Sequence, residues 1–226
     1  MCGRFLLTTD LDLLERAFGF DKGPRPNLQP RYNVAPTDPI PIVRRNREGT
    51  GRELAVVRWG LIPFWAKDAS VGGAKLINAR AESVTTKPAF REAFERRRCL
   101  VPADGFYEWQ KRADGKQPWL IRRRDHQPFG FAGLWDRWKG PGGPVETATI
   151  ITTEPNAVCA PLHNRMPVIL APDTYDAWLD PDRPGGEALL RPCPDDWLEV
   201  FPISRLVNNV RNDGPELIEP ERHLVG

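Results

Sequence analysis

The second residue of the chain is a cysteine, Cys2, which directly follows Met1. Methionine aminopeptidases remove an initiator methionine when the next side chain is small, and cysteine qualifies. The processed chain would begin with a 1,2-aminothiol, whose α-amine has an ordinary pKa of about 7.7–8.0 and is partly neutral at neutral pH. Such a terminus forms an imine with an aldehyde, and its thiol can then close a five-membered thiazolidine. A lone cysteine near a terminus is more often inert than catalytic, so a catalytic role for Cys2 needs support from other parts of the sequence.

Seven blocks along the chain combine charged, amide and aromatic side chains in an uncommon way. They are MCGRF at 1–5, RYNVAPT at 31–37, WGLIPFW at 59–65, INARAES at 77–83, PADGFYEW at 102–109, LHNRMPVIL at 162–170 and ISRLVNNVRND at 203–213. In this order, over essentially the whole chain, they resemble the SOS-response-associated peptidase (SRAP) family, the abasic-site processing proteins. The resemblance implies a sensor that traps abasic sites in single-stranded DNA as a covalent crosslink and protects the strand during the DNA damage response.

The resemblance implies four catalytic residues. Cys2 matches the family's nucleophile, and Asn78 matches the asparagine beside it. Glu108 matches the catalytic glutamate, and His163 the histidine of its block. The sugar of an abasic site is mostly a closed hemiacetal, so proton transfer must release its aldehyde. A carboxyl group with a raised pKa and an imidazole near neutrality suit this work, and an amide can orient an amine without titrating.

The resemblance also implies DNA contacts of three kinds. Arg4, Arg80 and Arg165 are expected to hold phosphates, and Asn33 and Thr152 are expected to lie near the site. Trp59, Pro63 and Trp65 are expected to form a wedge on which bases stack. A single-stranded partner is expected because a covalent trap needs the sugar splayed out of the strand.

Each of these residues also has a structural interpretation. Glu108 could be an ordinary strand residue, although its aromatic neighbours favour partial burial. The histidine could be a satisfied loop residue, Asn78 a turn cap, Thr152 a strand end, and the tryptophans core residues. The arginine runs at 96–98 and 122–124 are predicted to be mostly solvated, and Cys159 is assigned to packing.

Two other functions remain open from the sequence. The first is a cysteine peptidase, acting on itself or on others, in which Cys2, His163 and Glu108 would be nucleophile, base and orienting group. The second is a non-catalytic reader of modified DNA. The family further implies lyase chemistry, which cleaves the strand through the imine, and reversal of the crosslink with Glu108 as the best candidate.

Composition limits the partners. The net charge of +2 is nearly neutral, so any phosphate-binding surface must be a local patch. The four cysteines and three histidines show no zinc-like spacing, and we expect neither a metal nor a cofactor. The sequence shows no signal peptide and no apolar run that could span a bilayer. We therefore expect a reduced, cytoplasmic protein, monomeric and without membrane contact, near the nucleoid if bacterial.

Four helices are predicted from apolar spacing and terminal signals. The first begins near Thr9 and ends at Gly19, and the second has Pro88 in its first turn. The third begins near Pro172, and a short fourth helix lies around Glu187–Leu190.

Eight short apolar or alternating runs predict strands. They are Ile40–Arg44, Leu54–Trp59, Cys99–Val101, Phe106–Gln110, Trp119–Arg122, Phe129–Leu134, Thr147–Thr152 and Val200–Ile203. Turn signals lie at 114–115 and 139–144, and residues 21–38 predict an irregular loop. Strands joined by short turns, with helices set apart, indicate an α+β fold. We expect a single SRAP-type domain over 1–226, in which an antiparallel β-sheet or barrel core carries peripheral helices and a DNA-binding cleft. The last dozen residues are a candidate for a loosely packed tail.

Overall fold

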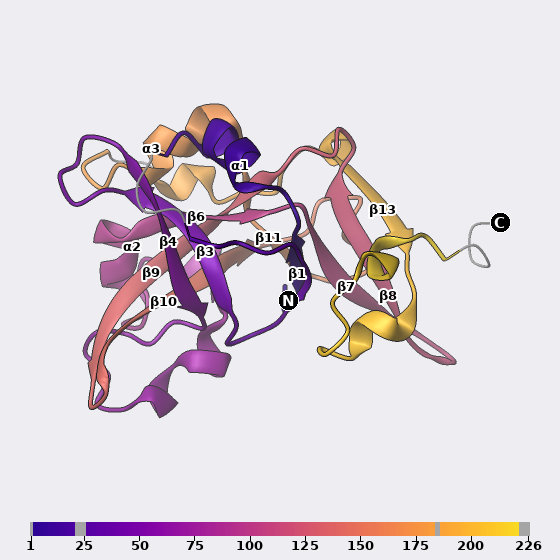
Figure 1. Cartoon of the computed structure of the whole chain (residues 1–226), viewed down its shortest axis with the longest axis horizontal. Helices are drawn as coiled ribbons and strands as arrows, with labels where there is room; N and C mark the ends of the chain where they lie inside the picture. Colours follow the sequence, from indigo (N-terminus) through magenta and orange to yellow (C-terminus); the bar gives the residue numbers. More distant parts are fainter. Residues whose placement is uncertain (1, 21–25, 184–185, 222–226) are drawn as a thin grey trace.

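The computed structural model describes residues 2–20, 26–183 and 186–221. These residues form two β-sheets with short helices around them (Figure 1). The strands are β1 (Phe5–Leu7), β2 (Arg31–Val34), β3 (Pro39–Arg45), β4 (Arg52–Trp59), β5 (Asn78–Arg80), β6 (Arg98–Ala103), β7 (Gly105–Arg112), β8 (Gly115–Arg123), β9 (Phe129–Gly140), β10 (Gly143–Thr153), β11 (Met166–Pro167), β12 (Ile169–Leu170) and β13 (Leu198–Pro202). The α-helices are α1 (Leu11–Phe18), α2 (Arg91–Arg96) and α3 (Tyr175–Leu179). The 3-10 helices are η1 (Ala69–Val71), η2 (Gly73–Leu76), η3 (Ala81–Ser83), η4 (Pro172–Thr174), η5 (Gly186–Leu189), η6 (Asp195–Trp197), η7 (Arg205–Asn208) and η8 (Pro215–Ile218).

Strand pairing closes the larger sheet into a barrel. The smaller sheet has the order β13-β8-β7-β1-β2, and the larger has the order β11-β10-β4-β3-β6-β9-β12, with β5 paired to β10. Because β9 also pairs with β10, the strands β10, β4, β3, β6 and β9 form a closed ring. Among the described strands, only the pairings of β4 and β5 with β10 are parallel. The predicted α+β fold with a sheet or barrel core is confirmed, with these two parallel pairings as an addition.

One apolar cluster joins the two sheets. Phe5 of the smaller sheet packs edge-on against Trp59 and Phe131 of the barrel, with ring centroids 5.2 and 6.0 Å apart. All three side chains are fully buried, and burying a phenylalanine contributes about 1.5–3 kcal/mol. This packing anchors β1, and with it the start of the chain.

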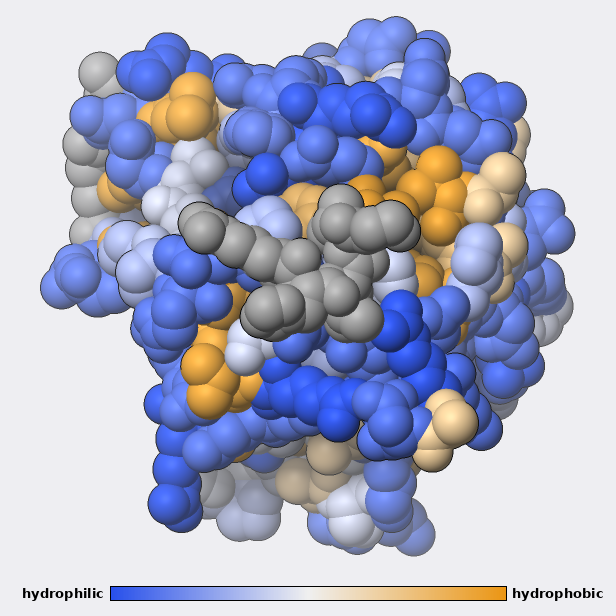
Figure 2. Space-filling model, turned by 90° about the vertical axis from the view of Figure 1, so that its right-hand side faces the viewer, coloured by the Kyte–Doolittle hydropathy of each residue, from blue (hydrophilic) through white to orange (hydrophobic). Residues whose placement is uncertain are grey.

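A second cluster lies on the other face of the smaller sheet. It contains Tyr107 of β7 and Leu217 of η8, both fully buried. Residues 215–221 therefore include a buried anchor, and residues 222–226 of the predicted tail lie outside the described residues. The side of the molecule that carries β13 is mainly hydrophilic, with separate apolar patches (Figure 2).

The N-cap residue of helix α1 differs from the predicted one. The Asp10 side chain, rather than Thr9, accepts the hydrogen bond from the Leu13 N–H at 2.8 Å. Gly19 ends the helix with a φ of 62°, a left-handed conformation that glycine adopts without steric cost. The Thr9 hydroxyl instead donates to Asp104 at 2.6 Å, which fastens this segment to the bend before β7.

The other predicted elements differ mainly in their boundaries. The turn signals at 114–115 and 139–144 mark the β7–β8 and β9–β10 hairpins, as predicted. The predicted third helix is η4 followed by α3, the fourth is the 3-10 helix η5, and α2 begins three residues after Pro88. The prediction of an irregular loop over 21–38 is wrong at β2, which pairs with β1; residues 21–25 lie outside the described residues.

The arginine runs are less exposed than predicted. Arg98 is 7% exposed and donates to the carbonyl oxygens of Phe94 and Trp178. The predicted solvation is wrong for Arg98, because α2 and α3 pack around the start of β6. Arg96 and Arg124 are exposed, as predicted.

All four cysteines are buried free thiols. Cys159, which the sequence assigns to packing, is 2% exposed within the main apolar cluster, and this prediction is confirmed. None of the helices in the described ranges has both the length and the apolar character needed to cross a membrane.

Candidate active site

Cys2 lies just before β1, beside the strand that carries Glu108. β1 pairs antiparallel with β7, and the Tyr107 N–H donates to the Arg4 carbonyl oxygen at 3.0 Å. Continued by two residues, this register brings Cys2 opposite Trp109, the residue after Glu108. The Cys2 side chain is fully buried. Met1, whose removal the sequence predicts, lies outside the described residues.

The Cys2 thiol is electrically neutral at physiological pH. Burial, and after it the charge of Glu108, raise the pKa of this thiol above its ordinary value. A thiolate is the nucleophilic form of cysteine, so this setting disfavours direct attack by sulfur. The influence of Glu108 on the thiol also shows that the two side chains lie within electrostatic reach of each other.

Glu108 is a buried carboxyl group on β7. Side chains alternate along a strand, so Glu108 shares a face with Phe106, which belongs to the apolar cluster between the sheets. The residue is 4% exposed, and burial raises its pKa to about 7. Near neutral pH such a group is present in both protonation states, so it can give and accept a proton. The sequence predicts partial burial of Glu108, and the structure buries it almost completely.

Asn78 lies on β5, which pairs with β10 of the barrel. Its Nδ2 donates to the carbonyl oxygens of Ile77 at 3.0 Å and Ile150 at 3.5 Å, which orients the amide. Its Oδ1 is buried and accepts no hydrogen bond from the described residues. Because buried polar atoms are seldom left unsatisfied, this oxygen is suited to accept a hydrogen bond from an amine or a hydroxyl group.

His163 lies on the loop between β10 and β11, with a defined tautomer. Its backbone N–H donates to the Cys159 carbonyl at 3.1 Å, and its Nδ1 accepts from the Arg165 N–H at 3.0 Å. The proton of the neutral ring is therefore on Nε2, and burial lowers the pKa of the ring. The loop lies against the end of β7, since Gln110 Nε2 donates to the Pro161 carbonyl at 3.4 Å.

Glu108 links the catalytic candidates. Its charge contributes to the raised pKa of Cys2. At Cys159, burial, Cys193 and then Glu108 raise the thiol pKa to about 12, which places the His163 loop near the same carboxyl group. Asn78 is connected to the site through its strand β5, which pairs with β10, the strand that leads into the His163 loop. It makes no hydrogen bond to the other catalytic candidates within the described ranges. The described residues contain no group of three or more His, Cys, Asp or Glu arranged as metal ligands.

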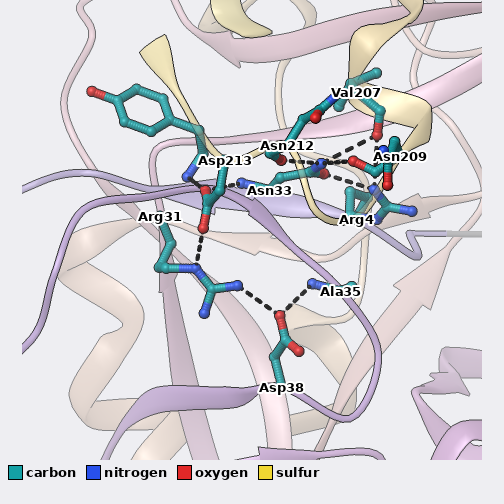
Figure 3. Close-up of polar contacts among 10 residues, drawn as sticks. Arg4, Arg31, Asn33, Ala35, Asp38, Val207, Asn209, Asn212 and Asp213 are labelled. Atoms are coloured by element: carbon teal, nitrogen blue, oxygen red, sulfur yellow. Dashed lines mark hydrogen bonds and ion pairs between the residues drawn. The ribbon is translucent and has the colours of Figure 1, made fainter.

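Arg4 and Asn33 form the centre of a polar network (Figure 3). Arg4 Nη1 donates to Asn33 Oδ1 at 2.7 Å and to the Val207 carbonyl at 2.9 Å. Asn33 is fully buried. Its Nδ2 donates, at 3.2, 3.1 and 2.8 Å, to the carbonyl oxygens of Val207, Asn209 and Asn212. The role of Asn33 is therefore structural: its side chain holds η7 and the residues after η7 against the strand pair β1–β2.

Asp213 completes this network, and the sequence analysis does not single it out. Its Oδ1 accepts from the N–H groups of Tyr32 at 2.5 Å and Asn33 at 3.0 Å, and its Oδ2 accepts from Arg31 Nε at 2.5 Å. Arg31 also pairs with Asp38 at 2.8 Å. The sequence feature that could have identified Asp213 is its position at the end of the ISRLVNNVRND block.

The remaining predicted phosphate ligands differ in availability. Arg80 is exposed, and its side chain makes no hydrogen bond within the described residues. The Arg165 side chain is 14% exposed, pairs with Glu82 at 2.6 Å and donates to the Thr152 carbonyl at 2.5 Å. Thr152 is fully buried. Arg80 is therefore open to a phosphate, whereas Arg165 is held in an internal ion pair.

The predicted wedge is divided between core and surface. Trp59 is fully buried and donates from Nε1 to the Ile77 carbonyl at 3.0 Å, and Pro63 is also buried. Neither can stack on a base in this conformation, so the core interpretation holds for Trp59, and Pro63 is buried as well. Phe64 and Trp65 are 44% and 47% exposed. The exposed apolar surface of this block thus consists of Trp65 and of Phe64, which is not among the residues predicted for the wedge.

The sequence matches the family described as SOS response associated peptidase (SRAP) over residues 1–210. The chain is 44% identical to the abasic site processing protein YoaM of Bacillus subtilis (strain 168), covering 99% of this chain and 100% of that protein. It is 33% identical to the abasic site processing protein YedK of Escherichia coli (strain K12), covering 97% and 100%. It is also 33% identical to the abasic site processing protein HMCES of Gallus gallus, covering 97% of this chain and 78% of that protein.

A solved structure has the same fold. The crystal structure of a protein from Bacteroides thetaiotaomicron superimposes with a TM-score of 0.85 at 28% sequence identity, covering 97% of this chain and 100% of that one.

Proposed function

The chain belongs to the SOS response associated peptidase (SRAP) family, and we propose that it captures abasic sites in single-stranded DNA covalently through Cys2. The relatives' names support abasic-site processing as the general activity. In the finer proposal, removal of Met1 turns the amide nitrogen of Cys2 into a primary amine, and the product is a thiazolidine crosslink to the ring-opened sugar. The observation that carries it is the position of Cys2, next to the β1–β7 strand pair, within electrostatic reach of Glu108, a buried carboxyl group with a pKa of about 7.

Imine formation is the first proposed step. Glu108 donates a proton to the ring oxygen, and its carboxylate then takes the proton of the C1 hydroxyl group, so that the ring opens to the aldehyde and Glu108 is protonated again. The Cys2 amine adds to the aldehyde carbon, and one of its protons passes to the new alkoxide oxygen. The resulting carbinolamine receives a proton from Glu108 and loses its hydroxyl group as water, while the nitrogen lone pair completes the C=N bond of an iminium ion. A carboxyl group that titrates near neutral pH suits this proton transfer, and an ordinary glutamate would be almost entirely ionised.

Ring closure by the thiol is the second proposed step. The neutral Cys2 thiol gives its proton to the Glu108 carboxylate as sulfur adds to the iminium carbon. The electron pair of the C=N bond returns to nitrogen, which yields a neutral thiazolidine and a protonated Glu108. The raised pKa of the thiol supports this order, because it leaves the amine as the first nucleophile.

Asn78 and His163 are proposed to orient the reactants. The buried, unsatisfied Asn78 Oδ1 is suited to accept an N–H of the Cys2 amine, which aims the lone pair without adding charge. The neutral His163 ring, with its proton on Nε2, is suited to donate to a sugar oxygen. These assignments rest on hydrogen-bonding capacity together with the family resemblance.

DNA binding is proposed to combine phosphate contacts with base stacking. Arg80 is exposed, and the half-buried Arg4 is held rigidly by Asn33 and the Val207 carbonyl, which suits a fixed phosphate ligand. Phe64 and Trp65 offer the exposed rings on which unpaired bases stack. Arg165 would take part after release from Glu82.

Denaturing electrophoresis tests the proposal. The wild-type protein is mixed with a single-stranded oligonucleotide that carries one abasic site, beside an intact oligonucleotide. Cys2→Ala is the test variant, and Cys159→Ala is a matched control, since that thiol also lies near Glu108. We expect a band that survives heat and detergent with wild type and Cys159→Ala, and none with Cys2→Ala. A heat-stable band in Cys2→Ala would contradict the proposal.

The alternatives make different predictions for the same reagents. A cysteine peptidase hydrolyses peptides and needs a thiolate, which the raised pKa of Cys2 disfavours. A reader of modified DNA binds reversibly and gives no covalent band with wild type. Strand cleavage through the imine, and reversal of the crosslink by Glu108, are proposed as side activities of the same site.

A further inference from the structure

A second basic site lies away from the candidate active site. A pocket of about 490 Å³ opens between the β3–β4 turn, the end of α2, the start of β6 and the turn after α3. None of the residues assigned above to catalysis or to DNA contact lines it. In Figure 1, α3 and the strands β3 and β4 lie on the opposite side of the molecule from β13 and β8.

The pocket is rich in arginine. Its arginines come from five different elements or turns: Arg44, Arg45, Arg47, Arg96, Arg98 and Arg137. Its acidic residues are Glu48, Glu53, Glu146 and Asp182. The lining thus has a surplus of two positive charges, one of which is balanced by Asp180, outside the lining, through its ion pair with Arg45 at 2.8 Å. This is a local patch of the kind that a nearly neutral protein needs in order to bind phosphate.

One wall of the pocket is rigid. The Arg44 guanidinium lies over the Trp135 ring, 4.0 Å from its centroid. Its Nε pairs with Glu53 at 2.6 Å and its Nη1 with Glu146 at 2.9 Å. A stacked guanidinium with two carboxylate partners keeps one geometry, so this wall is formed before any ligand arrives.

Arg98 supplies a buried cation that forms no ion pair within the described residues, although the charge of Asp180 acts on it from farther away. Its Nε and Nη1 donate to the carbonyl oxygens of Phe94 at 2.9 Å and Trp178 at 3.3 Å. No carboxylate of the described residues lies within ion-pair distance of it, although it is only 7% exposed. Buried charges are normally paired, and these bonds leave Nη2 of the guanidinium for an anion.

Three further arginines stand at the rim. Arg47, Arg96 and Arg137 are exposed and form no ion pair within the described parts of the chain. Guanidinium groups bind phosphate through paired, charge-assisted hydrogen bonds. We propose that this pocket binds a backbone phosphate of the DNA strand at a distance from the reacting nucleotide. The inference rests on the proposed function, because it takes DNA as the source of the phosphate.

The test removes the rim charges and leaves the buried arginines in place. The test variant is Arg47→Ser/Arg96→Ser/Arg137→Ser. A control with the same loss of charge uses exposed arginines outside the pocket: Arg16→Ser/Arg124→Ser/Arg191→Ser. Binding of unmodified single strands of about 40 and about 8 nucleotides is measured by fluorescence anisotropy over a range of salt concentrations.

A phosphate contact in the pocket predicts a specific pattern. The test variant should bind the long strand about tenfold more weakly, with a salt slope reduced by up to about 2, whereas the control should change much less. Crosslinking to a short abasic oligonucleotide should be unchanged in both variants. A test variant that loses no more affinity than the control would overturn the proposal.

A free phosphate ligand is distinguished by titrating inorganic pyrophosphate into wild type and the test variant. Binding of pyrophosphate that depends on the rim arginines, together with unchanged affinity for the long strand, would overturn DNA as the source. Loss of affinity for both ligands supports the proposal. Because these assays use unmodified DNA, their outcome is separate from any failure of covalent capture at Cys2.

Discussion

Replacing Glu108 with glutamine is expected to stabilise the protein at alkaline pH while slowing covalent capture. The pKa of this carboxyl group is about 7 in the folded state, against an ordinary value of 4.5. Between these values the folded protein holds a proton that the unfolded chain has lost. The stability linked to this proton is fully present below the unfolded pKa and is lost as the pH rises through the folded pKa. Integrating the difference from about pH 5 to about pH 8 gives a loss of about 2.5 kcal/mol.

Urea denaturation at these two pH values measures the effect. The free energy of unfolding of Glu108→Gln, relative to wild type, should rise by about 2.5 kcal/mol between about pH 5 and about pH 8. Glu82→Gln is a control of opposite sign, because the hydrogen bond from Arg165 lowers the pKa of Glu82. The ionised Glu82 side chain contributes stability above its unfolded pKa, and this contribution is lost as the pH falls. Replacing Glu82 should therefore lower the free energy of unfolding less at acidic pH than at neutral pH.

The same variant tests the chemistry. Glutamine keeps the shape of Glu108 but cannot transfer a proton, so the crosslinking rate should fall by about 10²–10⁴-fold. Affinity for an oligonucleotide with a reduced abasic sugar, which has no aldehyde, should be unchanged. A variant that shows no pH-dependent gain in stability, or that crosslinks at the wild-type rate, would refute the assignment of Glu108 as a buried, titrating proton donor.

Three further predictions concern binding and positioning. Asn78→Asp places a carboxylate where the amide oxygen lies, which should hold the amine protonated; crosslinking should slow at neutral pH and recover as the pH rises, as a pH–rate profile would show. Phe64→Ser/Trp65→Ser should weaken single-strand binding by about 1–3 kcal/mol per stacked base with the salt slope unchanged, and an altered slope would instead indicate lost phosphate contacts. Asp213→Ala removes the acceptor of two backbone N–H groups and an arginine, so urea denaturation should show a loss of about 2 kcal/mol, and wild-type stability would contradict the network.

Local signals in the sequence predicted the longer elements of the fold. Gly19 marks the end of α1, and the glycine-containing stretches at 114–115 and 139–144 mark two hairpins, because each needs a backbone conformation that few residues adopt. The strands β1, β2 and β5 have three or four residues, too few to show an alternating pattern. They form because the barrel and β7 supply partners for them, which local sequence does not encode.

The candidate site, like the fold, could be predicted from the sequence only in part. The resemblance identified the residues, and the aromatic setting of Glu108 predicted its burial. Which aromatic rings face solvent depended on the fold: Trp59 lies in the core, while Trp65 is exposed. The burial of Arg98 and the contacts of Asp213 with β2 join segments distant in sequence, and nothing in the local pattern foretells such pairs.

Mass spectrometry of the digested crosslink tests the central claim most directly. Wild-type protein is allowed to react with an abasic oligonucleotide, alkylated with iodoacetamide under denaturing conditions, and digested with protease and nuclease. We predict a terminal peptide that lacks Met1, carries the sugar remnant on Cys2, and has an unalkylated sulfur, because the thiazolidine blocks both nitrogen and sulfur. A peptide that retains Met1, an alkylated Cys2 sulfur, or a sugar remnant on any other residue would contradict the account.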